Sequence, residues 1–215
     1  CGSRKGHSEN ALAESHNRMS TSDRERWNEK YSQRQPPSHI EADAWLIEAI
    51  ELIEQSTSVV QTDRRALDIA CGLGHNAIWL AQRGWQVDGI DISNAGLQLA
   101  RQLAGTCKCD VNWIEADLDN WEPSANVCDL AIVFRFLDRV HVPRVVNTAL
   151  RAGGWLIYET FSRAQLKRAD THIRNPTFTL TAGELPTLFP DFDVVIHRED
   201  VLGDRTVERF LARRR

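Results

Sequence analysis

Two glycines spaced two residues apart follow an apolar run in the segment LDIACGLGHNA, which covers residues 67–77. Gly72 and Gly74 stand where a strand pattern changes into a helical pattern, and glycine lets the backbone come close to a ligand with no Cβ in the way. Turns of this kind hold adenosine-bearing cofactors, but a lone Gly-x-Gly pair recurs in loops of every sort and can also serve tight strand-helix packing. The surrounding elements must therefore show which use the turn has.

The same segment also matches a dinucleotide-binding fingerprint. Residues 72–77, GLGHNA, fit the pattern G-x-G-x-x-A, and Asp91 follows at close to the distance expected for an acid that binds ribose hydroxyls. Asp68 lies inside the run before the turn, where a carboxylate would repel a pyrophosphate but could pair with the ammonium group of an amino-acid cofactor. The motif alone leaves a NAD(P)-binding oxidoreductase open, whereas Asp68 favours an amino-acid cofactor.

Strand and helix patterns alternate through the middle of the chain. The predicted strands are RALDIA (65–70), WQVDGIDI (85–92), VNWIEAD (111–117), CDLAIVF (128–134) and GWLIYETF (154–161), and the predicted helices cover about residues 76–83, 94–104 and 142–150. Such alternation produces right-handed βαβ units and a parallel sheet with helices on both faces. Ligands bind beyond the carboxyl ends of such strands where the strand order reverses, so we expect the turn at residues 70–76 to face the ligand.

Two further helices are expected before this region, and an antiparallel pair of strands after it. Capping-box spacing at Ser22 predicts the start of the first helix, which Pro36 ends, and the second covers about residues 41–54. A short helix over about residues 183–189 precedes the strands FDVVIHRED and RTVERFLARR. The VLGD between these strands is too short for a crossover helix, which makes them antiparallel.

A doubly wound, mostly parallel α/β sheet of seven strands with a C-terminal antiparallel hairpin resembles the Rossmann-like fold of class I S-adenosylmethionine-dependent methyltransferases. The resemblance covers about residues 22–213 and is nearest to small bacterial methyltransferases of the tellurite-resistance type. It implies one methyltransferase domain over residues 22–215, with an N-terminal helical cap over about 22–55. The start of the chain is polar and poor in large apolar side chains, so residues 1–21 are expected to be a disordered leader or cloning remnant. The implied reaction is in-line displacement at the sulfonium methyl group of S-adenosylmethionine, which leaves S-adenosylhomocysteine and requires no metal.

The resemblance also assigns the expected cofactor contacts. Asp68 would lie near the methionine end, Asp91 at the ribose, and Asp117, in the segment EADL, at the exocyclic amine of adenine. Trp27 and Tyr31 resemble part of a Trp-Asp-x-x-Tyr-like segment and would cover the methionine end from one helix face. The complete expected set is Trp27, Tyr31, Asp68, Ala70, Gly72, Gly74, Asn76, Asp91, Ile92, Asp117, Leu118 and Phe134.

Two positions depart from the family pattern. Ala70 stands where a first glycine is common, and His75 stands where this subfamily often has arginine. Alanine adds only a methyl group, so binding should survive with slightly different packing of the turn. His75 leaves open whether the chain keeps a cationic contact to the cofactor carboxylate, because a histidine here can also simply begin a helix on the surface.

The acceptor is expected over the ends of the fourth and fifth predicted strands, near FRFLDR (134–139) and YETF (158–161). Each candidate also has a structural reading as an ion pair, a helix start or a core residue. A soft anionic nucleophile such as a thiolate or a reduced metalloid oxyanion needs no general base, and none stands out. Enzymes that methylate nucleic-acid bases carry Asp/Asn-Pro-Pro-aromatic here, so Phe-Arg-Phe-Leu favours a small-molecule acceptor. The candidate catalytic contacts are Arg135, Tyr158 and His172, followed by Asp138, His141 and Glu159.

The segment from Ser162 to Thr179 is longer than the usual connection of about 2 to 6 residues. It has few large apolar side chains, so we expect a mobile lid, with an ordinary solvated loop as the alternative. Its positive charge would favour an anionic acceptor. The charged and titratable residues that carry this expectation are Arg163, Lys167, Arg168, His172 and Arg174.

Composition limits the remaining possibilities. The 215 residues are 42% hydrophobic and carry a formal net charge of -4, which fits one globular core and disfavours a nucleic-acid partner. No apolar run approaches the roughly 20 residues of a membrane span. Five cysteines with no disulfide-framework spacing fit a reducing cytoplasm, and Cys107 and Cys109 lack a second cluster to complete a metal site. We expect a cytoplasmic monomer or homodimer, with a non-catalytic cofactor-binding module as a further alternative.

Overall fold

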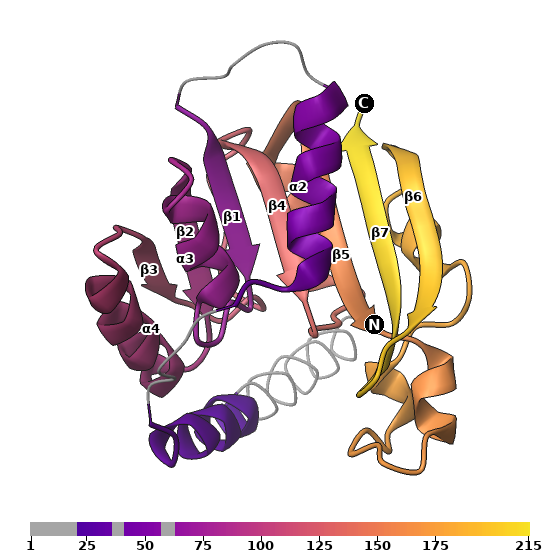
Figure 1. Cartoon of the computed structure of the whole chain (residues 1–215), viewed down its shortest axis with the longest axis horizontal. Helices are drawn as coiled ribbons and strands as arrows, with labels where there is room; N and C mark the ends of the chain where they lie inside the picture. The colour runs from indigo at the N-terminus through magenta and orange to yellow at the C-terminus, as the bar shows by residue number, and fades with distance from the viewer. Residues whose placement is uncertain (1–20, 36–40, 57–62) are drawn as a thin grey trace, which may run out of the picture.

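A sheet of seven strands forms the centre of the computed structural model, which describes residues 21–35, 41–56 and 63–215. The strands are β1 Arg65–Ile69, β2 Gln86–Asp91, β3 Asn112–Glu115, β4 Cys128–Phe134, β5 Leu150–Phe161, β6 Phe192–Val201 and β7 Thr206–Arg214. Their order within the described residues is β3-β2-β1-β4-β5-β7-β6 (Figure 1). The first five run parallel, and β7 is antiparallel to both β5 and β6. The expected doubly wound sheet with an antiparallel C-terminal pair is confirmed.

Helices cover both faces of this sheet. They are α2 Ala44–Ser56, α3 His75–Ala81, α4 Asn94–Cys107, α5 His141–Ala149 and α6 Glu184–Leu188. Trp45 of α2 and Ile78 of α3 are buried against one face, whereas Val145 of α5 and Leu185 of α6 are buried against the other. Figure 1 shows α2, α3 and α4 on the viewer's side. None of the described helices combines the length and the apolar character that crossing a bilayer requires.

A further helical stretch, residues 21–32, lies along one edge of the sheet. Figure 1 shows it in indigo below α4 and the arrowhead of β1, on the side of the sheet where the parallel strands have their carboxyl ends. Residue 21 is already helical, so Ser22 does not begin this helix as the capping-box spacing predicts. Residues 1–20, which hold nearly all of the expected leader, and Pro36 lie outside the described residues.

The turn between β1 and α3 sits where the strand order reverses. β1 pairs with β2 on one side and with β4 on the other, which is the geometry that opens a ligand crevice at the carboxyl edge. Ala70, Gly72 and Gly74 have φ angles of 57°, 55° and 71°. All three lie in the left-handed region, where only glycine is free of steric cost, so Ala70 holds a strained backbone at the position where the family commonly has glycine.

The start of β5 differs from its expected place. The glycine pair Gly153 and Gly154 predicts the end of the preceding helix, but α5 ends at Ala149 and both glycines lie inside β5. Gly153 has a φ of 77°, and the pairing register between β4 and β5 shifts nearby. The pair therefore produces an irregular strand start rather than a helix cap.

Candidate functional site

Three acidic side chains follow one another along the carboxyl edge of the sheet. Asp68 is near the end of β1, Asp91 is the last residue of β2, and Asp117 comes two residues after β3. These three strands are adjacent and parallel, so their ends meet at a single edge. The arrangement matches the order in which the sequence predicts contacts to the methionine, ribose and adenine parts of a cofactor.

Asp91 ties the glycine turn to the end of β2. Its Oδ2 accepts a hydrogen bond from the Gly72 N–H at 2.8 Å, and its Oδ1 accepts one from the Ser93 N–H at 2.8 Å. Burial raises the pKa of Asp91, although these backbone N–H groups work in the opposite direction. Each carboxylate oxygen has a second lone pair, so the side chain can still accept hydrogen bonds from the hydroxyls of a ligand.

Asp68 carries, at this edge, a buried carboxylate oxygen without a partner in the described part of the chain. It is 2% exposed, and its Oδ2 has no hydrogen-bond partner among the described residues. Burial raises the pKa of Asp68 well above its usual range, and the carboxylates of Asp43 and Asp91 raise it further. A buried polar atom without a partner costs free energy, so the geometry favours a ligand that brings a hydrogen-bond donor to this oxygen.

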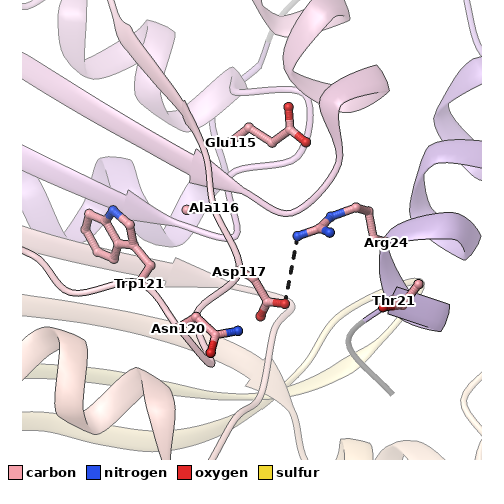
Figure 2. Close-up of a pocket in the computed structure, with 7 residues that line it drawn as sticks. All are labelled: Thr21, Arg24, Glu115, Ala116, Asp117, Asn120 and Trp121. Carbon is pink, nitrogen blue, oxygen red and sulfur yellow. Dashed lines mark ion pairs between the residues drawn. The ribbon is translucent and has the colours of Figure 1, made fainter. Parts of the chain in front are cut away.

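A pocket of about 340 Å³ opens at the far end of the edge, beyond β3. Figure 2 shows Arg24, from the helical stretch 21–32, reaching towards Asp117, with Asn120 and Trp121 on the sheet side of the pocket. The Arg24 Nη2 lies 3.9 Å from the Asp117 Oδ2. Leu118, also expected here, is buried. The pocket combines a carboxylate acceptor with an indole wall, which suits a planar base with an exocyclic amine.

The helical stretch 21–32 contacts the edge at three places. Besides Arg24, its Asn28 accepts hydrogen bonds from the Ser93 Oγ at 2.8 Å and the Ala95 N–H at 3.1 Å, at the start of α4. Tyr31 lies against the glycine turn, and burial raises its pKa. The rings of Trp27 and Tyr31 stack with centroids 5.8 Å apart, so the two aromatics share one helix face as their spacing predicts.

The two glycines of the turn are required for different reasons. A Cβ on Gly72 would lie 2.6 Å from the Tyr31 hydroxyl oxygen, whereas a Cβ on Gly74 would lie 2.2 Å from a ring carbon of Trp113 in β3. Gly74 therefore makes room for packing within the domain, which is the second use that such a glycine pair can have. Gly72 makes room for the Tyr31 side chain, which lies against the turn at the carboxyl edge of the sheet.

A charged cluster joins the starts of α2 and α3 to the end of β4. Asp43 precedes α2, and its Oδ2 lies 3.0 Å from the His75 Nε2 and accepts a hydrogen bond from the Asn76 Nδ2 at 2.9 Å. Its Oδ1 accepts a hydrogen bond from Arg135. Burial opposes the charge on Asp43, but hydrogen bonds from His75 and Arg135 outweigh it and hold its pKa well below the usual range. Asp43 is absent from the sequence-predicted set, although an Asp directly before an apolar helical run is a typical N-cap signal.

The three candidate catalytic residues are not brought together. Arg135 belongs to the cluster with Asp43, but Tyr158 is 1% exposed and its hydroxyl donates to the Phe136 carbonyl at 3.0 Å. His172 is exposed, with its ring edge-on to Phe161 at 6.2 Å. Tyr158 is thus a core residue on the α5 side of the sheet and cannot contact an acceptor in this arrangement.

The remaining acceptor candidates have structural partners. Asp138 accepts hydrogen bonds from backbone N–H groups at the start of α5 and lies 2.9 Å from the His141 Nδ1. Asp119 lies 3.2 Å from the same nitrogen, and ligand atoms of these three residues all fall within 4.8 Å, a spacing that a metal ion could use. Glu159 is fully buried and accepts a hydrogen bond from Arg209 at 2.8 Å. Phe134 packs in the core beneath α2.

The segment 162–179 contacts the rest of the domain through a β-bridge at its start and hydrogen bonds in its middle. Ser162 forms an isolated β-bridge with Leu180. Arg168, one of its expected cationic residues, ion-pairs with Asp170 and donates to the carbonyls of Leu202 and Gly203 in the turn before β7. The charge of Arg168 is therefore occupied by this turn rather than presented to an acceptor. Residues 163, 167 and 174 are exposed.

Comparisons with known proteins agree on one class of fold. Residues 66–154 match the family model described as a methyltransferase domain. Among curated proteins, a ubiquinone biosynthesis O-methyltransferase of Alkalilimnicola ehrlichii is 33% identical over 105 residues, which cover 46% of this chain and 42% of the relative. The chain spans about half the length of the curated relatives that it matches.

Two solved structures show the same fold at low identity. Magnesium protoporphyrin IX methyltransferase from Synechocystis PCC 6803, with bound S-adenosylhomocysteine, has a TM-score of 0.68 at 16% identity, covering 91% of this chain and 99% of the other. TehB from Haemophilus influenzae has a TM-score of 0.62 at 18% identity, covering 88% of this chain and 67% of the other. These similarities establish the architecture that the sequence predicts.

Proposed function

We propose that this chain, which has the class I methyltransferase fold with a methyltransferase domain over residues 66–154, transfers a methyl group from S-adenosylmethionine to a small molecule. One observation carries the proposal. The carboxyl edge presents Asp68, Asp91 and Asp117 at the ends of three consecutive strands, with the buried Asp68 Oδ2 lacking a partner among the described residues. An amino-acid nucleoside would supply an ammonium group, two ribose hydroxyls and an adenine amine, in that order.

The residues present fit this cofactor. Asp68 would accept from its ammonium group, Asp91 from its ribose hydroxyls and Asp117 from its adenine, while residues 21–32 would cover it. When bound, S-adenosylmethionine supplies an electrophilic methyl group on a positively charged sulfur. The chain's own part is to align the nucleophile behind that methyl group and to exclude water, which residues of a fixed edge and a covering helix can do.

The proposed acceptor is a nucleophile that is already soft or anionic. Near the ends of β4 and β5, Asp138 and Glu159 are engaged in structural pairs, which argues against either one as a general base. A thiolate or a reduced oxyanion would need no proton removed. An oxygen acceptor is the second candidate, because similar curated proteins of Alkalilimnicola ehrlichii and Paraburkholderia phymatum are named ubiquinone biosynthesis O-methyltransferases.

Calorimetry with S-adenosylhomocysteine and with NAD tests the cofactor assignment. We expect binding of S-adenosylhomocysteine and weaker or no binding of NAD, whereas tighter binding of NAD would overturn the assignment in favour of an oxidoreductase. Transfer of a labelled methyl group to a panel of small thiols, oxyanions and phenols tests the activity. Cofactor binding without transfer to any of them would instead support a non-catalytic binding module.

A further inference from the structure

We propose that Arg135, positioned by Asp43, binds the α-carboxylate at the methionine end of the cofactor. This inference rests on the proposed function and assigns a cation to the place where the subfamily often has arginine and this chain has His75. The cation would then come from the end of β4 instead of from the first residue of α3. Arg135 would be a cofactor ligand rather than the acceptor contact that its position after β4 predicts.

Arg135 is held at the strand-order reversal by its backbone. It directly follows β4, the neighbour of β1, and its N–H donates to the Glu159 carbonyl at 2.8 Å. Its φ is 54°, a left-handed conformation that is rare for a residue with a long side chain. Strained residues of this kind persist where the surrounding structure requires them, and they cluster at ligand sites. The strain therefore points to a required direction for the Arg135 side chain.

Asp43 sets that direction. It accepts a hydrogen bond from Arg135, although the two residues are 92 positions apart in the sequence. Asp43 is itself fixed, because its N–H donates to the Asn76 Oδ1 and its carboxylate accepts from the Asn76 Nδ2, both at 2.9 Å. The starts of α2 and α3 are thus joined, and the joined pair holds the guanidinium.

The carboxylate of this cluster is more deeply buried than its two nitrogen-bearing side chains. The Asp43 side chain is 7% exposed, whereas those of Arg135 and His75 are 31% and 28% exposed. The Arg135 Nη2 lies 3.0 Å from the His75 Nε2, so guanidinium and imidazole form one accessible nitrogen-rich surface. A ligand that approaches this surface meets the guanidinium, which can only donate hydrogen bonds, and this favours a carboxylate.

Asp68 supplies the complementary half of the recognition. Asp68 of β1 pairs in register with Ile132 of β4, and Arg135 directly follows β4, so the two residues lie at the same end of neighbouring parallel strands. The Asp68 Oδ2 is buried and lacks a partner among the described residues, so it can receive a donor. A carboxylate with one oxygen unpartnered in the described chain, beside an accessible guanidinium, matches an α-ammonium and α-carboxylate on one carbon atom. A dinucleotide carries no such pair.

The test compares two ligands that share the adenosine but differ in the amino acid. S-adenosylhomocysteine has the α-carboxylate, and 5′-methylthioadenosine lacks the whole amino-acid part. In calorimetry, we expect Arg135→Gln to lower the affinity for S-adenosylhomocysteine about tenfold or more. The affinity for 5′-methylthioadenosine should change by less than about twofold. Arg135→Lys should fall between Arg135→Gln and the unchanged chain, because lysine keeps the charge but loses the planar fork.

Two further variants separate positioning from general damage. Asp43→Asn should lower the affinity for S-adenosylhomocysteine several-fold and leave the affinity for 5′-methylthioadenosine unchanged. Arg139→Gln is the matched control, since Arg139 is in the same loop but ion-pairs with Glu184. This variant should change the affinity for neither ligand.

Each contrary result has a defined meaning. Equal losses for both ligands in Arg135→Gln would show a merely structural role and overturn the inference. Unchanged binding of S-adenosylhomocysteine by Arg135→Gln would overturn it too, return Arg135 to the acceptor side and leave the proposed function standing. Failure of the unchanged chain to bind either ligand would instead remove the proposed function, and the inference with it.

Discussion

The hydroxyl oxygen of Tyr31 lies 2.6 Å from the position that a Cβ on Gly72 would occupy, and the ring carbon Cζ lies 3.6 Å from it. This contact joins the helical stretch 21–32 to the turn after β1. Because it forms only where Gly72 has no side chain, docking of the stretch and the shape of the turn depend on each other.

Gly72→Ala should destabilise the chain through two separable effects. The φ of 55° costs an alanine about 1–2 kcal/mol, and the new methyl group meets the Tyr31 oxygen. Tyr31→Phe removes that oxygen and leaves Cζ at an ordinary contact distance, so the double variant should recover the steric part but not the backbone part. Urea unfolding of the four chains measures this coupling, and strictly additive effects would contradict it.

Asp91→Ala should weaken the binding of S-adenosylhomocysteine by about 1–3 kcal/mol. The change removes the proposed acceptor for the ribose hydroxyls and leaves the Gly72 and Ser93 N–H groups unpaired. Calorimetry measures the change. Asp88→Ala is the control on the same strand, because Asp88 lies in the middle of β2 and accepts a hydrogen bond from Asn112 of β3. Similar losses in both variants would argue against a specific role for Asp91.

Asp68→Asn should change stability and binding in opposite directions. The folded state holds the Asp68 proton more tightly than the unfolded state does, so the free energy of unfolding falls as pH rises from the unfolded pKa of about 3.9 towards the raised folded pKa. Asparagine removes this penalty, and the variant should gain stability relative to the unchanged chain as pH rises. Denaturant titrations across this pH range measure the gain.

The binding of Asp68→Asn provides the second readout. An amide cannot carry the negative charge that pairs with an ammonium group, so S-adenosylhomocysteine should bind more weakly while 5′-methylthioadenosine is unaffected. Unaltered affinity for both ligands would contradict the role proposed for Asp68.

The helical stretch 21–32 should matter more for cofactor affinity than for stability. Deleting residues 1–34 removes the Asn28 contacts with Ser93 and Ala95 and uncovers the turn. We expect weaker binding of S-adenosylhomocysteine with a smaller change in the melting temperature of the ligand-free chain, and Asn28→Ala should show part of the same effect. Equal affinity after the deletion would exclude a covering role.

Arg168→Gln should loosen the segment 162–179, since it loses two hydrogen bonds to carbonyls of the turn before β7. Limited proteolysis should cut this segment faster in Arg168→Gln and at the normal rate in the control Arg174→Gln, whose residue is exposed. For a lid, S-adenosylhomocysteine with a small anionic acceptor should slow cleavage in the unchanged chain. A cleavage rate that stays the same with and without the two ligands would favour an ordinary solvated loop.

The sequence by itself predicted the order of the strands and helices and the edge of the sheet at which the candidate site lies. Strand patterns run apolar because both faces of a parallel sheet are covered, and β4 runs over the same residues as its predicted segment, 128–134. Asp91 and Asp117 could be placed together because parallel strands end at one edge, so their positions after successive strands suffice. The fingerprint alone left two cofactors open, since it describes a backbone shape that both use.

Only the tertiary structure decided which side chains meet. Tyr158 and Glu159 are neighbours in β5, yet one packs on the α5 side while the other pairs with Arg209 of β7, which lies between β5 and β6. Asp43 reaches Arg135 across 92 positions, and Trp113 fills the space beside Gly74. Local patterns cannot specify such contacts, because they depend on how layers pack and in which order strands join the sheet. Those arrangements are set by burial summed over the whole core rather than by the residues on either side of a motif.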